Sequence, residues 1–182
     1  QELGGEDLFR QEYPSTPQEA FLTTGRLFVE PKFIDQAAVE CYTPISRYDV
    51  RESEFVPHEK GLLKIFENPK DSLRYCMGVD VSEGLEHGDY SCIQVLDHYG
   101  NQVATWTGHV DPFELAHIVG TVGMYYKKAW TLIERNNHGL TTIRKIQELG
   151  YPNLYVEQTV DDAYVDKLTR RAGFLTTSKT KP

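Results

Sequence analysis

The chain has 182 residues, of which 40% are hydrophobic and 25% charged, so it can bury a globular core as one domain or one domain with an appendage. Its formal net charge of −8 argues against attraction of the whole protein to nucleic acid. The sequence contains no run of about 18 apolar residues, so it predicts no transmembrane helix.

The first part of the chain, up to about residue 60, has no clear hydrophobic period. Ser15 or Thr16 can cap a short helix predicted over 17–22, and 31–38 is predicted to form another turn or two. Prolines interrupt the segment at Pro14, Pro17, Pro31, Pro44 and Pro57. We expect an arm wrapped on a domain. Because the chain starts at Gln1 without a signal peptide, we also expect a fragment or a processed product.

Strand patterns dominate the next part of the chain. Residues 60–67 are strand-like, and an apolar run over 75–81 reaches an acid at Asp80. Strands are also predicted over 91–97 and 102–109, separated by a short turn. The last three of these strands are expected to form an antiparallel meander.

Helices and short strands alternate after residue 110. Asp111 is predicted to cap a helix, with proline at the first position and Glu114 three residues after the cap. A strand over 130–133, a helix over 139–149 and a strand over 154–156 follow. The apolar face of the first helix recurs at helical spacing in Leu115, Ile118, Val119, Val122, Tyr126 and Ala129. The element order predicts a mixed α/β sheet with helices on its faces, as a ribonuclease H-like fold requires.

Two acids occupy matching positions in this pattern. Asp80 and Glu134 each follow an apolar strand, and ligands gather at the carboxyl ends of strands in open sheets. If the two strands are parallel neighbours, the carboxylates lie side by side and resist ionising together. Oxygen ligands of this kind suit Mg²⁺ or Mn²⁺, and two such ions can hydrolyse a phosphodiester. Asp89 can face the same edge of the sheet.

Each of these acids also has a simpler interpretation. A single aspartate after a strand is more often a turn former, a single glutamate is more often a surface charge, and Asp89 can be a turn acid. Asn137 or His138 can cap the following helix, or can orient substrate or water beside the metal site. His138 has no second zinc-type ligand nearby in the sequence, so a zinc site is not predicted.

The cysteines and the basic end of the chain carry less information. Cys41, Cys76 and Cys92 have no metal-ligand spacing and are predicted to be reduced and buried. From residue 167 the chain carries five basic residues and no acid, which indicates either a solvated loop or a contact with a phosphate backbone. The basic residues are Lys167, Arg170, Arg171, Lys179 and Lys181.

Several motifs, in the same order, resemble the nuclease domain of large terminase subunits from tailed phages. They are Met77-Gly78-Val79-Asp80, Gly88-Asp89-Tyr90-Ser91, the run from Ile133 to Gly139 and the run from Leu149 to Tyr155. The arm from Phe9 to Pro14 with Glu19-Ala20-Phe21 is similar to the segment that joins the packaging ATPase to the nuclease, and Thr177 to Pro182 also resembles that family.

The resemblance implies a ribonuclease H-like nuclease that cuts concatemeric phage DNA during packaging. It implies an arm or linker from the ATPase domain over 1–58 and a nuclease domain over 59–182. Asp80 and Glu134 match metal-binding catalytic acids, with Mg²⁺ or Mn²⁺ as cofactor, and Asp89 matches an auxiliary acid. The third acid of the family lies on a helix beyond the end of this chain, so we expect weak metal binding and little cleavage from these 182 residues.

The implied partners are double-stranded DNA, the portal, the small terminase subunit and the ATPase domain of the same protein, in the host bacterial cytoplasm and without a membrane. Low-ranked candidates for DNA contacts are Asn137, His138, Lys167, Arg170, Arg171 and Lys179. Rival hypotheses are another nuclease of this fold, such as a junction resolvase or transposase-type enzyme, and a non-catalytic docking module for the portal or small subunit. An actin-like ATPase lacks support because the glycine-rich phosphate turn is missing.

Overall fold

The computed structural model describes residues 31–135, 138–160 and 168–177. The chain divides into two units, Gln1–Tyr42 and Thr43–Pro182. In the first unit the described residues form helix α2, Pro31–Glu40, where the sequence predicted a turn or two of helix. The helix predicted over 17–22 lies outside the described residues.

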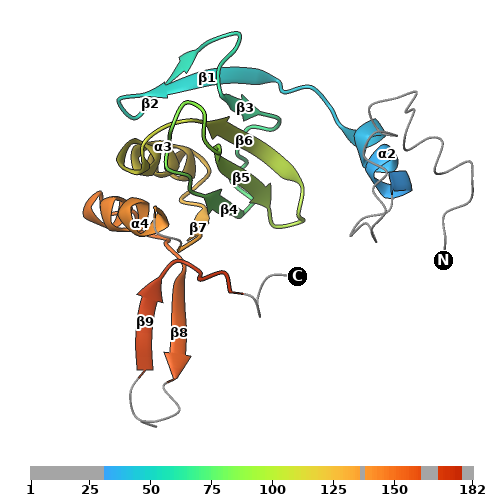
Figure 1. The fold of residues 1–182 in the computed structure, drawn as a ribbon. Helices are drawn as coiled ribbons and strands as arrows, with labels where there is room; N and C mark the ends of the chain where they lie inside the picture. Colours follow the sequence, from blue (N-terminus) through green and yellow to red (C-terminus); the bar gives the residue numbers. More distant parts are fainter. Residues whose placement is uncertain (1–30, 136–137, 161–167, 178–182) are drawn as a thin grey trace, which may run out of the picture. The chain divides into compact units, whose positions relative to one another are not determined.

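The second unit holds the sheet and two helices (Figure 1). Its strands are β1 Ser46–Arg51, β2 Glu54–Pro57, β3 Leu63–Ile65, β4 Tyr75–Asp80, β5 Ser91–Asp97, β6 Gln102–Gly108, β7 Trp130–Ile133, β8 Val156–Val160 and β9 Leu168–Ala172. Its helices are α3 Pro112–Tyr125 and α4 Gly139–Glu148. None of the helices in the described ranges is long and apolar enough to cross a membrane.

Seven strands form one mixed sheet in the order β2-β1-β3-β6-β5-β4-β7. Strands β4, β5 and β6 make the predicted antiparallel meander, and β7 pairs in parallel with β4. Beyond β7 the parallel order continues through a bridge between Thr131 and Leu154, close to the predicted last strand. This strand order, with helices against the sheet, is that of the ribonuclease H-like fold.

The first two strands lie where sequence analysis placed the end of the arm. β1 and β2 form an antiparallel hairpin, and β1 also pairs with β3, which joins both strands to the sheet. The turn between them places Glu52 and Ser53 in the left-handed region, with φ of 47° and 65°. Neither residue is the glycine or asparagine that usually marks such a turn, so the hairpin carries no strong sequence signal.

The core lies between one face of the sheet and the two helices. Along β4 the buried residues are Tyr75, Met77 and Val79, and the intervening residues are exposed. The residues predicted to form the apolar face of this helix are all buried, but α3 ends at Tyr125, so the last two of them follow it: Leu115, Ile118, Val119, Val122, Tyr126 and Ala129. Asp111 caps α3 as predicted, because its carboxylate accepts hydrogen bonds from the backbone N–H groups of Phe113 and Glu114.

The opposite face of the central strands is open in the described part of the chain. Cys76 is exposed and Cys92 is half-buried, and both thiols are free, as is the exposed Cys41. The prediction of reduced cysteines is confirmed, but the prediction that they are buried is wrong. Both strand cysteines fall on the alternate positions that point away from α3 and α4.

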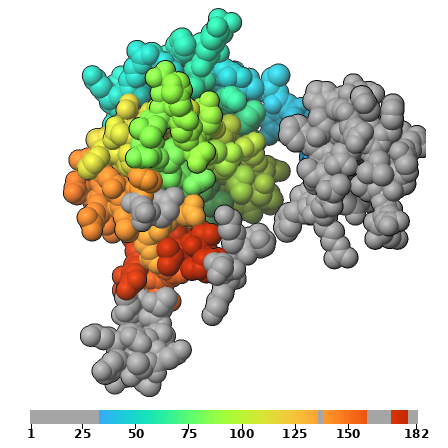
Figure 2. Space-filling model, viewed as in Figure 1, coloured from blue at the N-terminus to red at the C-terminus, as the bar shows by residue number. Residues whose placement is uncertain are grey.

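The end of the described chain forms a separate two-stranded hairpin. β8 pairs with β9 in register from Val156 opposite Ala172 to Val160 opposite Leu168. After β9 the chain returns to the sheet, where Phe174 forms a parallel bridge with Glu134. Figure 2 shows this returning segment (red) packed against the surface of β7 and α4 (orange).

Candidate metal centre

The parallel pairing of β4 and β7 brings two carboxylates together. Val79 and Ile133 are partners in the ladder, and the backbone N–H of Glu134 donates to the carbonyl of Val79 at 3.0 Å. The next side chains, those of Asp80 and Glu134, lie on the open face of the sheet, close enough for Glu134 to raise the pKa of Asp80. Their juxtaposition is therefore set by strand register, because each directly follows the last pair of the β4–β7 ladder.

The electrostatics of Asp80 reflect this pairing. Although the residue is exposed, partial burial of its carboxyl group raises the pKa of Asp80, and the hydrogen bond and negative charge of Glu134 raise it further. A hydrogen bond from the backbone of Val81 acts in the opposite direction on this pKa, and the charge of Asp89 raises it. The surroundings of Asp80 therefore favour the protonated form of its carboxyl group.

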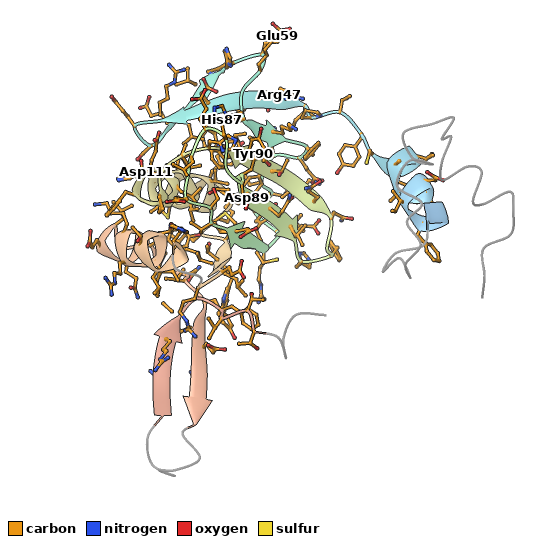
Figure 3. The ribbon with its side chains drawn as sticks, viewed as in Figure 1. Arg47, Glu59, His87, Asp89, Tyr90 and Asp111 are labelled. Carbon is orange, nitrogen blue, oxygen red and sulfur yellow. The ribbon has the colours of Figure 1, made fainter. Side chains whose placement is uncertain are left out.

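Asp89 lies in the loop between β4 and β5, which also carries His87 and Tyr90 (Figure 3). The loop is closed at its base because Ser82 bonds to Ser91 twice: its N–H donates to the Ser91 hydroxyl at 2.9 Å, and the two hydroxyls are 3.0 Å apart. Asp89 is exposed and acts on Asp80 through its charge.

The donor chemistry at this edge suits a hard divalent cation. Two carboxylates that repel each other are relieved by a bound cation, and carboxylate oxygens are preferred ligands of Mg²⁺ and Mn²⁺. Within the ranges that the structure describes, no group of three or more such side chains is placed to hold a metal ion. Among the described residues, Asp80 and Glu134 are two carboxylates that could hold such a cation, and a complete site would need further ligands.

The other site residues predicted from the sequence do not join Asp80 and Glu134 in the described part of the chain. His138 occupies the N-cap position of α4, half-buried, but its side chain makes no capping hydrogen bond. Arg170 and Arg171 are exposed on β9, where sequence analysis expected a loop or a phosphate contact. Asn137, Lys167, Lys179 and Lys181 lie outside the described residues.

Sequence analysis missed Arg135, which follows Glu134 directly. Its side chain is only 10% exposed, and its Nη2 atom donates to Oε2 of Glu157 at 2.7 Å. Its Nη1 atom is buried and has no partner among the described residues, and its backbone N–H donates to the carbonyl of Phe174. No local pattern could reveal this role, because both contacts come from the hairpin and the segment after it.

Comparison with solved structures finds large terminase nucleases. The large terminase nuclease from thermophilic phage G20c is 15% identical in sequence, with a TM-score of 0.44 over 59% of this chain and 52% of that chain. The same nuclease with bound magnesium is 16% identical, with a TM-score of 0.46 over 60% of this chain and 52% of that one. The large terminase nuclease domain of Thermus phage P74-26 is 14% identical, with a TM-score of 0.37 over 71% of this chain and 81% of that one.

The chain is thus similar in structure to phage terminase nuclease domains at low sequence identity. It spans about half the length of the G20c nuclease chains that it matches. That nuclease has also been solved with bound cobalt and with bound zinc. No protein-family model and no curated protein sequence matches this chain.

Proposed function

We propose that this chain is the nuclease domain of a phage large terminase subunit, a metal-dependent endonuclease that cuts concatemeric DNA during genome packaging. The observation that carries the proposal is the Asp80–Glu134 carboxyl pair at the ends of two parallel strands. The order of its sequence motifs, which resembles that of terminase nucleases, supports the assignment. Two surface carboxylates without a shared role would not be expected to lie at matching positions of two neighbouring parallel strands.

In this proposal Asp80 and Glu134 hold Mg²⁺ or Mn²⁺. The bound cations supply an activated water and stabilise the leaving oxygen of the phosphodiester. Asp80 would have to be ionised to hold such a cation, so its raised pKa would weaken cation binding as the pH falls. Asp89 orients ligands or water from the neighbouring loop, and His138 lies at the start of α4, where it can contact substrate.

The remaining ligands and contacts belong to the wider protein. The resemblance implies a third acid on a helix that follows this chain, an ATPase domain before the arm over 1–58, and the portal and small terminase subunit as partners in the host bacterial cytoplasm. Arg170 and Arg171 on β9 are exposed basic residues suited to the phosphate backbone of double-stranded DNA. Lys167, Lys179 and Asn137 remain candidates for the same contact.

A plasmid-cleavage assay tests the proposal. The 182-residue chain and a version extended beyond Pro182 are incubated with supercoiled plasmid and Mn²⁺. We expect cleavage from the extended version, little from the shorter one, and none when the cation is chelated. Asp80→Asn in the extended version should lower the rate by more than about 100-fold, since even groups that only orient metal ligands contribute about 10–100-fold.

The matched control is Glu148→Gln, which removes an exposed carboxylate at the end of α4. Its cleavage rate should equal that of the unmodified chain. Unchanged cleavage in Asp80→Asn would refute the assignment of the acid pair, and cleavage restricted to branched DNA would indicate a junction-resolvase-type enzyme.

A non-catalytic docking module for the portal or small subunit is the second candidate. It is favoured by the finding that the described residues bring two acids together and not three. Calorimetry separates the two candidates: the nuclease is expected to bind Mn²⁺ through Asp80 and Glu134, whereas the docking module would bind a partner tightly and Mn²⁺ not at all.

A further inference from the structure

A groove runs along the outer face of α3, between the β1–β2 turn and the loop after α4. It encloses about 570 Å³, within the range of about 300–1,000 Å³ typical of ligand sites. Neither Asp80 nor Glu134 lines it. Its lining residues are Ser53, His117, Gly120, Thr121, Met124, Lys128, Leu149, Gly150, Tyr151 and Pro152.

The lining combines exposed apolar surface with positive charge. Met124 is 50% exposed and Leu149 is 45% exposed, so two large apolar side chains face solvent in one hollow. Lys128 is the charged side chain of this lining, and no carboxylate belongs to it. This is a basic and apolar surface on a protein whose formal net charge is −8.

Fixed contacts hold the wall of the groove on the α4 side. The hydroxyl of Tyr151 donates to the carbonyl of Ala129 at 2.6 Å and accepts from Thr131 at 3.2 Å. Its ring fills the space that a side chain at Gly123 would need, because a Cβ there would lie 2.2 Å from the Tyr151 hydroxyl. The wall is therefore formed before any ligand arrives.

The rims of the groove contain strained backbone. Glu52, Ser53, Lys127 and Lys128 are the non-glycine residues with positive φ in the described part of the chain. Two of them line the groove: Ser53 in the β1–β2 turn and Lys128 after α3. Such conformations persist where surrounding structure holds them, and they concentrate at sites that bind ligands.

We propose that this groove binds a segment of a partner protein that presents an aliphatic or aromatic side chain beside a carboxylate. The apolar side chain covers Met124 and Leu149, and the carboxylate pairs with Lys128. Nucleic acid fits the groove less well, since it would meet one lysine and an apolar floor on an acidic protein. The adjoining hollow contains Glu52 and Glu114 as well as Arg51, so a purely acidic ligand would be repelled there.

The test uses three hexapeptides added to the ¹⁵N-labelled chain and followed by NMR. The first has two glutamates followed by leucine and phenylalanine between glycines, the second has lysines in place of the glutamates, and the third has serines in place of the apolar pair. We expect saturable shifts at Gly120, Met124 and Gly150 with the first peptide. The affinity for the other two should be at least fivefold lower.

Gly120→Leu is the blocking variant. A Cβ at Gly120 meets nothing within 4 Å, and a glycine inside a helix is less favourable than a larger residue, so the variant should fold with an equal or higher Tm. The first peptide should no longer bind it, whereas Asp80→Asn, which leaves the groove intact, should bind normally. That last comparison separates this proposal from the proposed nuclease activity.

Three results would overturn the proposal. Equal binding of all three peptides would show non-specific adsorption, and undiminished binding by Gly120→Leu would place the site elsewhere. Sedimentation that shows a dimer of the unmodified chain and a monomer of Gly120→Leu would identify a second copy of the chain as the occupant.

Discussion

Asp97 and Asp80 are two acids at strand ends with opposite environments. Asp97 is buried, and although burial alone would raise its pKa, hydrogen bonds from Asn101 and Tyr99 hold the pKa of Asp97 below its usual range. Asp80 has one bond from Val81 that favours its charged form, and it faces a second carboxyl group in Glu134. Asp97 is therefore a turn former stabilised by its charge, and Asp80 is an acid whose charge costs stability.

This difference gives stability a predictable dependence on pH. The pKa of Asp80 is raised in the folded chain, so between its unfolded and folded values the folded state holds a proton that the unfolded state has released. The free energy of unfolding then decreases as pH rises through that window. Asp80→Asn should remove the decrease and, without metal, should stabilise the chain at about pH 7.5 by up to about 1 kcal/mol, a small effect because the site is exposed.

Urea unfolding of both proteins at about pH 7.5 and at about pH 2.5, well below the unfolded aspartate pKa of about 3.9, measures this effect. The two curves should coincide at the lower pH, where Asp80 is protonated in both states. Glu148→Gln serves as the control and should follow the unmodified chain at both values. An Asp80→Asn variant that is less stable at the higher pH would show that Asp80 contributes to folding and would contradict the pairing described here.

At the level of elements, sequence patterns predicted those parts whose signals are local. The strands β4 to β7, both long helices and the adjacent ends of β4 and β7 follow from apolar periodicity and capping residues. The β1–β2 hairpin lacks a turn signature, and β8 and β9 are polar strands without alternation, so neither hairpin was predicted. The buried cysteines were wrongly predicted because an apolar run does not reveal which face of a strand is covered.

The β8–β9 hairpin is joined to the sheet by an ion pair as well as by backbone hydrogen bonds of the segment after β9. Two strands alone are marginally stable, and this hairpin is attached to the sheet through Arg135 and Glu157. Glu157→Ala would leave the buried Arg135 guanidinium without its partner and should cost about 3 kcal/mol. Arg135→Met removes the charge itself and should cost less. Urea unfolding of the two variants provides the measurement.

The exposed pair Lys145–Glu148 is the matched control for this ion pair. Its atoms are 3.4 Å apart and Glu148 is 67% exposed, so Glu148→Ala should change stability by no more than about 0.5 kcal/mol. Equal losses in Glu157→Ala and Glu148→Ala would mean that the Arg135–Glu157 pair behaves as an ordinary surface contact and does not anchor the hairpin.

At the scale of the whole molecule, the sheet has two unequal faces. One is covered by α3 and α4, and the other presents Cys76, Gly78 and Asp80 to solvent in the described part of the chain. A β-carbon at Gly78 would meet nothing within 4 Å, so the surface beside Asp80 has no side chain of its own there. In the described part of the chain, Asp80 is therefore open to solvent on a face of the sheet and does not lie at the bottom of a deep pocket.

The parallel pairing of β7 with β4, which includes the hydrogen bond from the N–H of Glu134 to the carbonyl of Val79, also affects the order of folding. The strands of the meander, β4, β5 and β6, are close together in the sequence. β7 pairs with β4 across a long stretch of chain that includes β5, β6 and α3. Pairings between distant residues are generally made late, because loop closure must come first. The acid pair should therefore be absent from the folding transition state.

A cation that binds only the finished pair should slow unfolding and leave the rate of folding unchanged. At a concentration of about 100 Kd, Mn²⁺ should lower the unfolding rate by about 100-fold, and Asp80→Asn should abolish the effect. Stopped-flow unfolding and refolding with and without Mn²⁺ would measure both rates, and faster refolding with Mn²⁺ would show that the two strands meet early. The cation is thus expected to lower the unfolding rate of the assembled sheet and to leave its folding rate unchanged.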